Sequence, residues 1–370
     1  MAKLRQTIRA YRPVVVALLV GLIGLGGGLA ALRGARRSPD DTQLGLPGKR
    51  FGRLMLPHDD RMHTDADTEW WYFTGHLEAD DGQRYGYELC AIKTYNDPSR
   101  LGPLTLPRSY EVDFAITDQA AGKFFSSVRM MLALPIYRMN ERRLDVHYGR
   151  TRIRAIAPFT YRLRTHRGRQ ALDLIVRAIK PPLAQGDDGW VEMGTGGGSY
   201  YSSITRLETS GRLTVEGETK QVRGLSWMDH QWGCWDWSGV SGWDWLSIQL
   251  ENGTDLMAFV FRGGGGQVAT LYRSDGSVLT IRDYTLNSTG EWTSPVTGAT
   301  YPSGWRLTIP EVQAELDVTP VLENQEVVNK DYPDGTYWEG SNTVEGTIEA
   351  HPTSGKAYVE LTGYVRPLNV

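Results

Sequence analysis

Apolar and polar residues alternate along short runs from residue 70 to the C-terminus, and turn-forming dipeptides separate the runs. Clear examples of such runs are YFTGHLEA, GRLTVEG, WLSIQLENG and AYVELTGYV. The breaks between runs include Asp81-Gly82, Asn252-Gly253, Asp275-Gly276 and Ser354-Gly355. A period of two residues is typical of half-buried strands, and these dipeptides supply the positive φ of tight hairpins. The pattern predicts an antiparallel all-β protein; only residues 130–135 (MMLALP) hint at a helix.

The strand pattern occurs twice along the chain. Trp70-Trp71 opens a hairpin that turns at Asp81-Gly82, and Trp243 and Trp245 open another that turns at Asn252-Gly253. A long unit used only twice indicates a duplicated domain rather than a solenoid. We therefore expect two β-barrels side by side, the first at residues 51–230 and the second at 231–370.

The N-terminal residues have the pattern of a membrane anchor. An uncharged run spans residues 13–32, with basic residues on both sides, and a bilayer-spanning helix needs about 20 apolar residues. No clean cleavage site follows the run, so we expect an uncleaved signal anchor or transmembrane segment at residues 1–37 and a linker at 38–50. The globular part would then lie outside the cytoplasm, in the periplasm or the extracellular space.

Composition narrows the possible partners. The chain has 370 residues, a net charge of −3 and no dominant basic block, so it is not built to bind nucleic acid. Its two cysteines, Cys90 and Cys234, are too few for a disulfide scaffold. In an oxidising compartment they could pair, or they could be two buried thiols.

The densest candidate chemistry lies in residues 224–246. Six of the twelve tryptophans fall in this segment, together with Asp229 and His230. A carboxylate beside a histidine can serve acid–base chemistry, and aromatic walls can bind an apolar ligand. Adjacent strand residues point to opposite faces, so Asp229 would share a face with Gln231, and His230 with Trp232. The alternative is a tryptophan-rich core around a structural histidine.

A second candidate is Glu69, which directly precedes two tryptophans and follows His63 by six residues. Burial raises the pKa of a carboxyl group, so Glu69 could act as a general acid or orient a partner. The alternative is a buried ion pair. His58 and His63 lack the tight spacing of a metal motif, so we expect no metal site.

Several motifs, in order, resemble the AttH-like family related to carotenoid 1,2-hydratases, often labelled "predicted secreted hydrolase". They are TEWWYFTG (68–75), DGQRYGYEL (81–89), KPPLAQGD (180–187), SYYSSITRL (199–207), GLSWMDHQWG (224–233), GWDW (242–245) and YVELTGY (358–364). The resemblance covers the chain from about residue 50 onward. It implies two lipocalin-like barrels and, for the hydratases, addition of water to an isoprenoid double bond without a cofactor.

The resemblance also implies site residues. The Asp-His-x-Trp element of the hydratases matches Asp229, His230 and Trp232, whereas their Tyr-x-Asp pair has no counterpart in the stretch 256–262. With Glu69, these residues give the catalytic candidates Asp229, His230 and Glu69. The residues expected to line a ligand site are Trp70, Trp71, Tyr72, Tyr200, Tyr201, Trp227, Trp232, Trp235, Trp243 and Trp245.

Three functions remain open at this point. The chain could be a cofactor-free hydro-lyase for an isoprenoid, carotenoid or lipid-like molecule. It could be a membrane-tethered carrier that shelters such a ligand without changing it. The third is the hydrolase that the family label suggests, although the chain has no G-x-S-x-G nucleophile motif.

Overall fold

The computed structural model describes residues 54–95, 108–132, 138–186, 188–193, 197–237, 240–263 and 266–368. The expected anchor and linker, at residues 1–37 and 38–50, lie outside these ranges. Among the residues that are described, no helix has the length and apolar character needed to cross a membrane.

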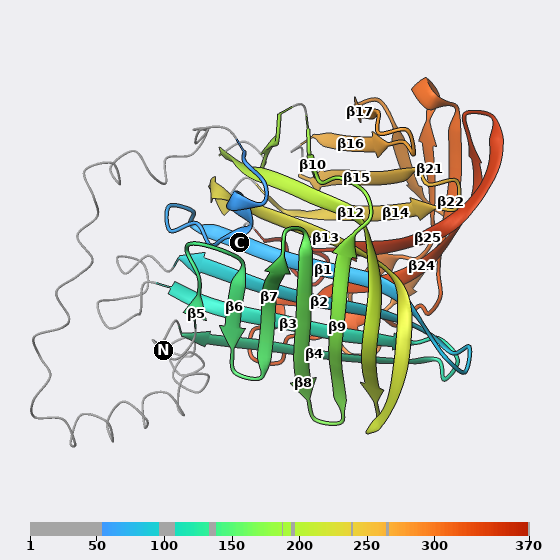
Figure 1. Ribbon diagram of the computed structural model, residues 1–370. Helices are drawn as coiled ribbons and strands as arrows, with labels where there is room; N and C mark the ends of the chain where they lie inside the picture. Colours follow the sequence, from blue (N-terminus) through green and yellow to red (C-terminus); the bar gives the residue numbers. More distant parts are fainter. Residues whose placement is uncertain are drawn as a thin grey trace, which may run out of the picture. The chain divides into compact units, whose positions relative to one another are not determined.

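The described chain is almost entirely β-structure, arranged in two large antiparallel sheets that curl (Figure 1). The first sheet has 13 strands in the order β4-β3-β2-β1-β13-β12-β9-β8-β7-β6-β5, with β10 and β11 also pairing with β12. Its strands are β1 (Thr68–Ala79), β2 (Arg84–Tyr95), β3 (Arg108–Asp118), β4 (Lys123–Leu132), β5 (Arg138–Met139), β6 (Asp145–Tyr148), β7 (Thr151–Ala157), β8 (Thr160–Arg167), β9 (Gln170–Ala178), β10 (Leu183–Ala184), β11 (Trp190–Glu192), β12 (Gly197–Val215) and β13 (Glu218–Trp235).

The second sheet has 10 strands in the order β17-β16-β15-β14-β25-β24-β22-β21-β18, with β23 also pairing with β24. Its strands are β14 (Gly242–Leu250), β15 (Asp255–Arg262), β16 (Gln267–Tyr272), β17 (Val278–Ile281), β18 (Thr285–Ser288), β21 (Trp305–Ile309), β22 (Ala314–Pro320), β23 (Glu326–Val327), β24 (Tyr337–Ile348) and β25 (His351–Leu361). Within the described residues, the remaining elements are the pair β19 (Glu291–Thr293) and β20 (Thr300–Pro302) and three short 3₁₀ helices, η2 (His58–Asp60), η4 (Pro310–Val312) and η5 (Pro333–Gly335).

The two sheets repeat one plan. In the first, the last hairpin, β12-β13, is inserted beside β1; in the second, the last hairpin, β24-β25, is inserted beside β14 in the same way. The two hairpins that the sequence pattern pairs, β1-β2 and β14-β15, occupy equivalent places in this plan. The chain leaves the first sheet at the end of β13, Trp235, and enters the second at Gly242, slightly beyond the junction expected at residue 230.

Each sheet encloses its own apolar core. The first core includes Trp71, Phe73 and Leu89, and the second includes Leu246, Trp305 and Trp338. A third apolar cluster lies where strands β1, β2, β12 and β13 meet β14, β15 and β25, and we call this region the seam. Its buried members are Tyr72, Cys90, Val191, Met193, Tyr201, Trp227, Trp235, Val240, Trp243, Trp245, Met257, Phe259, Phe261, Val268 and Tyr358.

Two local predictions are wrong. Ser354-Gly355 is not a turn but lies inside β25, and the hairpin turns instead at Glu349 and Ala350, whose φ values are 52° and 62°. Gly355 is required for close packing, since a Cβ there would lie 2.4 Å from the carbonyl oxygen of Gln249. The hint of a helix at residues 130–135 is wrong for the part that the structure describes, because β4 continues through Leu132; residues 133–135 lie outside the described ranges.

Cys90 and Cys234 are both free, buried thiols. Burial raises the pKa of Cys90 well above its ordinary value and that of Cys234 to about 12. The sequence left open whether the two cysteines form a disulfide bond, and in the structure they do not.

Candidate functional site

Strand β13 presents its two catalytic candidates to opposite faces of the first sheet, as the alternation predicts. Asp229 points into the seam, where Tyr201, Ser203 and Trp227 contact it. His230 points to the other face and contacts Glu69. The sequence neighbours Asp229 and His230 therefore belong to two different sites.

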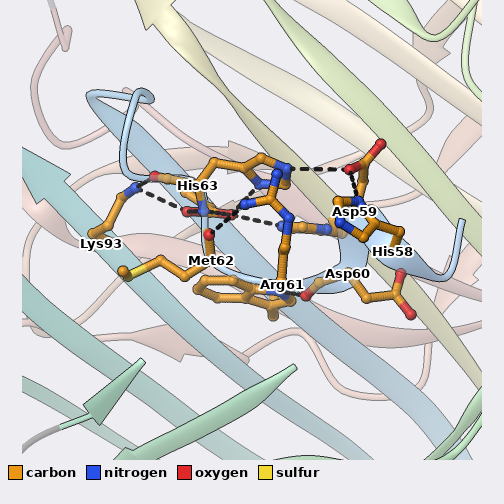
Figure 2. A network of polar contacts seen from close by, with 10 residues as sticks. His58, Asp59, Asp60, Arg61, Met62, His63 and Lys93 are labelled. Atoms are coloured by element: carbon orange, nitrogen blue, oxygen red, sulfur yellow. Dashed lines mark hydrogen bonds and ion pairs between the residues drawn. The ribbon is translucent and has the colours of Figure 1, made fainter. Parts of the chain in front are cut away.

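Glu69 is the centre of the site on the inner face, and two of its partners, His63 and Lys93, are labelled in Figure 2. One of its oxygens lies 2.8 Å from Nδ1 of His63 and 3.0 Å from Nε2 of His230. The other lies 2.8 Å from Nζ of Lys93 and accepts the backbone N–H of His63 at 2.9 Å. Lys93 also donates to the carbonyl oxygen of His63. The register of β1 with β2 places Glu69 directly opposite Lys93, so the ion pair is a cross-strand pair.

Burial and charge act against each other in this network. Glu69 is completely buried, which raises its pKa, but Lys93 and the two histidines outweigh that and hold it below the ordinary value. Burial lowers the pKa of His230 to about 4, so its imidazole is neutral near pH 7. For His63, the hydrogen bonds with Asp59 and Glu69 outweigh burial and raise the pKa. Glu69 is thus an ionised carboxylate in a buried ion pair rather than a protonated acid.

Aromatic rings pack around the histidines of this network. The ring of His63 stacks on Trp232 at 4.1 Å between centroids, and His230 stacks on Trp71 at 5.0 Å. Trp232 continues the stack to Tyr200 at 5.6 Å. Three of the residues expected to line a ligand site, Trp71, Trp232 and Tyr200, therefore pack beside Glu69 and not in the seam.

His63, Glu69 and His230 are also the residues that could hold a metal ion, because their ligand atoms lie within 4.8 Å of one another. These atoms already form hydrogen bonds with each other, and the Lys93 ammonium group lies 2.8 Å from Glu69. A fixed positive charge at that distance opposes a second cation in a buried site. The residues do not fit a metal well.

The seam contains the remaining aromatic candidates. Tyr72, Tyr201, Trp227, Trp235, Trp243 and Trp245 are buried there, with Trp70 partly buried against them. Trp245 donates a hydrogen bond to the hydroxyl oxygen of Tyr201 at 2.9 Å, which joins β14 of the second sheet to β12 of the first. Its ring lies edge-on to Tyr72 at 5.2 Å and to Trp227 at 6.3 Å. The contacts between the two sheets therefore include the aromatic rings that surround Asp229.

Asp229 is an unusual carboxyl group. It accepts hydrogen bonds from Tyr201, Ser203 and Trp227, the last at 2.7 Å. These hydrogen bonds favour the charged form, but complete burial outweighs them and raises the pKa to about 7. A carboxyl group with this pKa holds a proton near neutral pH and can also release it, as a general acid must.

Further carboxyl groups extend from Asp229 along the seam. Strand pairing places Asp229 beside Tyr72, Tyr72 beside Cys90 and Cys90 beside Asp113, in one row across the first sheet. In the second sheet, Trp245 pairs with Glu360 and Glu360 with Glu339. The hydroxyl of Tyr72 donates to Glu339 at 2.7 Å, so these two rows face each other.

The sequence patterns did not point to Glu88, Asp113, Glu339 or Glu360. Burial raises the pKa of Glu88 to about 8, that of Glu360 to about 7 and those of Asp113 and Glu339 well above the ordinary value. A charged residue in the middle of an otherwise apolar strand was the available signal, as in the sequence YGYELCA around Glu88. That signal shows that a residue is unusual, but the facing strand that explains it is far away in the sequence.

A separate basic groove lies on the exposed face of β6–β9 and β12. It has a volume of about 450 Å³, and its lining includes His147, Arg152, Arg164, His166 and Arg212. Arg164 and Arg212 lie 3.5 and 3.4 Å from the carboxylate of Asp173, which also pairs with Arg162 at 2.8 Å. The groove contains none of the candidate residues that the sequence indicates.

A family model and a solved structure both relate this chain to AttH. The model of the AttH-like family matches residues 47–364. A solved structure assigned to AttH from Nitrosomonas europaea has 29% sequence identity and a TM-score of 0.76, and the similarity covers 87% of this chain and 99% of that one.

Two named enzymes are more distant. The structure of kievitone hydratase from Nectria haematococca has a TM-score of 0.69 over 88% of this chain and all of that one, but only 18% identity, so the likeness shows the fold alone. The dehydratase asqC of Emericella nidulans is 24% identical over 227 residues, which are 55% of this chain. The match spans 61% of the length of that curated relative.

Proposed function

Because the chain belongs to the AttH-like family, whose fold is shared with a hydratase, we propose that it is a cofactor-free hydro-lyase for an apolar small molecule. The reaction would take place in the seam, with Asp229 as the general acid. The observation that carries this proposal is a carboxyl group with a pKa of about 7, completely buried among aromatic rings where two sheets meet. We further infer that the two curled sheets are a pair of lipocalin-like barrels.

The chemistry follows from the surroundings of Asp229. Its proton passes to one carbon of a double bond, which leaves a positive charge on the neighbouring carbon. The faces of Trp227 and Trp245 can stabilise that charge by cation–π interaction. A water molecule then adds its oxygen to the cationic carbon and returns a proton to Asp229. Run backwards, the same steps remove water from an alcohol.

In this proposal Glu69 and His230 are positioning residues. Glu69 fixes both histidines and Lys93 on the inner face of the first sheet. Asp229 lies on the same strand as His230, so this network sets the position of β13. The apolar lining of the seam also supports a second function, a carrier that binds the ligand without reaction.

The test compares Asp229→Asn with Asp244→Asn. Asp244 is a matched control, because it is also a carboxyl group with a raised pKa, about 6, and accepts a hydrogen bond from Tyr364. It lies between Trp243 and Trp245 on β14, so its side chain points away from the seam. Farnesol, farnesal and farnesene are incubated with each protein in deuterated water, and gain or loss of water is followed by mass spectrometry. The Asp229 variant should lose about 100-fold or more of the rate, and the control should keep it.

The pH dependence gives a second readout. Asp229 is faced by Tyr201, Ser203 and Trp227. Burial, and then repulsion by Asp229, raise the pKa of Glu360 on β25. The rate should fall as the pH rises through about 7, because Asp229 then loses the proton it donates. Equal rates for the two variants would exclude Asp229 as the acid. Tight binding without turnover by the unaltered protein would instead favour the carrier.

We also propose that the N-terminal apolar run tethers the protein to a membrane with the sheets outside the cytoplasm. The support is the length of the run and its basic flanks. Fractionation of cells that express the full chain tests the tether: recovery in the membrane pellet supports it, and release into the soluble fraction refutes it.

A further inference from the structure

Two tyrosine–glutamate hydrogen bonds cross the seam in opposite directions. Tyr72 of β1 donates to Oε1 of Glu339 on β24 at 2.7 Å. Tyr337 of β24 donates to Oε1 of Glu88 on β2 at 2.8 Å and also contacts Asp113 of β3 at 3.0 Å. Each carboxyl group therefore has one oxygen that is occupied by a hydroxyl from the facing sheet.

The second oxygen of each glutamate has no partner. Glu88 is 1% exposed and Glu339 is not exposed at all, yet within the described part of the chain Oε2 of each lacks a hydrogen bond. Buried polar atoms are nearly always satisfied, and an unsatisfied one costs stability. Together with Oδ1 of Asp113, which also lacks a partner, these atoms leave a group of buried polar atoms that a polar group of a ligand could satisfy.

The environment determines what that group must be. The charges that act on Glu339 are those of the carboxyl groups Glu88, Glu360 and Asp113, and burial likewise disfavours ionisation. A neutral carboxyl group carries one proton. Because Tyr72 donates to Oε1 of Glu339, the proton of Glu339 lies on its Oε2, which has no acceptor. Tyr337 has one hydroxyl proton, which it donates to Oε1 of Glu88, while the neutral Asp113 donates its proton to the oxygen of Tyr337. The proton of Glu88 then also lies on Oε2.

We propose that Glu88 and Glu339 form a subsite that donates hydrogen bonds to an oxygen atom of the ligand, so that the substrate is an oxygenated isoprenoid-like or lipid-like molecule rather than a hydrocarbon. This inference rests on the proposed function, since it assigns the polar end of the same ligand. The carboxyl groups of the seam then have two roles. Asp229 serves the reacting double bond, and the glutamate pair anchors the oxygen and sets which double bond reaches Asp229.

The experiment measures binding and needs no turnover. Farnesene, farnesal and farnesylamine share one carbon skeleton and end in a hydrocarbon, a hydrogen-bond acceptor and a cation. Quenching of tryptophan fluorescence in the full chain gives the three dissociation constants at neutral pH. The subsite predicts that farnesal binds about tenfold more tightly than farnesene, the usual value of one buried hydrogen bond.

Variants separate a neutral donor from a charged carboxylate. Glu339→Gln keeps an N–H donor at the same place and should keep the preference for farnesal, whereas Glu339→Leu should lose it. Glu88→Gln and Glu88→Leu repeat the comparison in case a substitution at Glu339 does not fold, which circular dichroism reveals.

The results that overturn the inference are distinct from those that overturn the proposed function. Equal affinity of the unaltered protein for farnesal and farnesene would remove the donor subsite. Tightest binding of farnesylamine, abolished by Glu339→Gln, would show a cation subsite instead. Either result leaves the loss of turnover in Asp229→Asn untouched, and a preference for farnesal persists even if Asp229 proves not to be the acid.

Discussion

The buried pair of Lys93 and Glu69 allows a sharp test of how the first sheet is held together. Both side chains are completely inaccessible, and Nζ lies 2.8 Å from the carboxylate. Replacing Lys93 by Met keeps the length and apolar volume of the side chain but leaves the charge of Glu69 buried without its principal partner. Removing one member of a buried pair typically costs about 3–5 kcal/mol.

The same chain supplies a control. Arg306 and Asp317 form an ion pair of similar length, 2.7 Å, but their side chains are 55% and 48% exposed. An exposed pair of this kind contributes about 0–1 kcal/mol, so Arg306→Met should change little. The comparison therefore varies burial while the chemistry of the deletion stays nearly the same.

Urea unfolding, followed by tryptophan fluorescence, measures the free energy of unfolding of both variants. We expect Lys93→Met to lower the denaturation midpoint strongly at an unchanged slope, and Arg306→Met to leave the midpoint almost in place. If the two variants differ by less than about 1 kcal/mol, the ion pair does not hold the inner face of the first sheet.

Three further outcomes are expected. The carboxyl groups of the seam, such as Glu88 with a pKa of about 8, bind protons in the folded protein that the unfolded chain releases near its ordinary pKa of 4.5. The free energy of unfolding should thus fall as the pH rises between these values, and Glu88→Gln should flatten that slope in urea titrations. Cys90 and Cys234 should react with a thiol reagent only after unfolding, because both are buried and have raised pKa values; rapid reaction of the native protein would contradict this. Gly224→Ala should reduce the melting temperature by several degrees, since its Cβ would lie 1.9 Å from the carbonyl oxygen of His76, and an unchanged value would show that the strands can separate.

Local patterns in the sequence predicted much of the fold. The turn at Asp81-Gly82 and that at Asn252-Gly253 both have glycine at positive φ, and the duplicated hairpins occupy equivalent places in the two sheets. The opposite orientation of Asp229 and His230 follows from strand geometry alone. By contrast, a glycine that permits close strand packing looks the same in sequence as a turn glycine, which is why the prediction at Gly355 failed.

The residues of the site were harder to predict than the strands, because contacts between distant parts of the sequence bring them together. The spacing of His63 and Glu69 pointed to a buried pair, but Lys93 completes it from the neighbouring strand. Glu339 comes 267 residues after Tyr72, and only the meeting of two sheets brings them together. No period within one strand could show that these carboxyl groups face each other, so the sequence indicated the tryptophans of the seam and missed its acids.

The most direct measurement is a crystal structure of the protein with farnesal bound. The account predicts that the aldehyde oxygen lies within hydrogen-bond distance of Glu88 or Glu339, and that the chain runs past Trp245 toward Asp229. Farnesal bound instead in the basic groove near Arg164, with the seam unchanged, would contradict it.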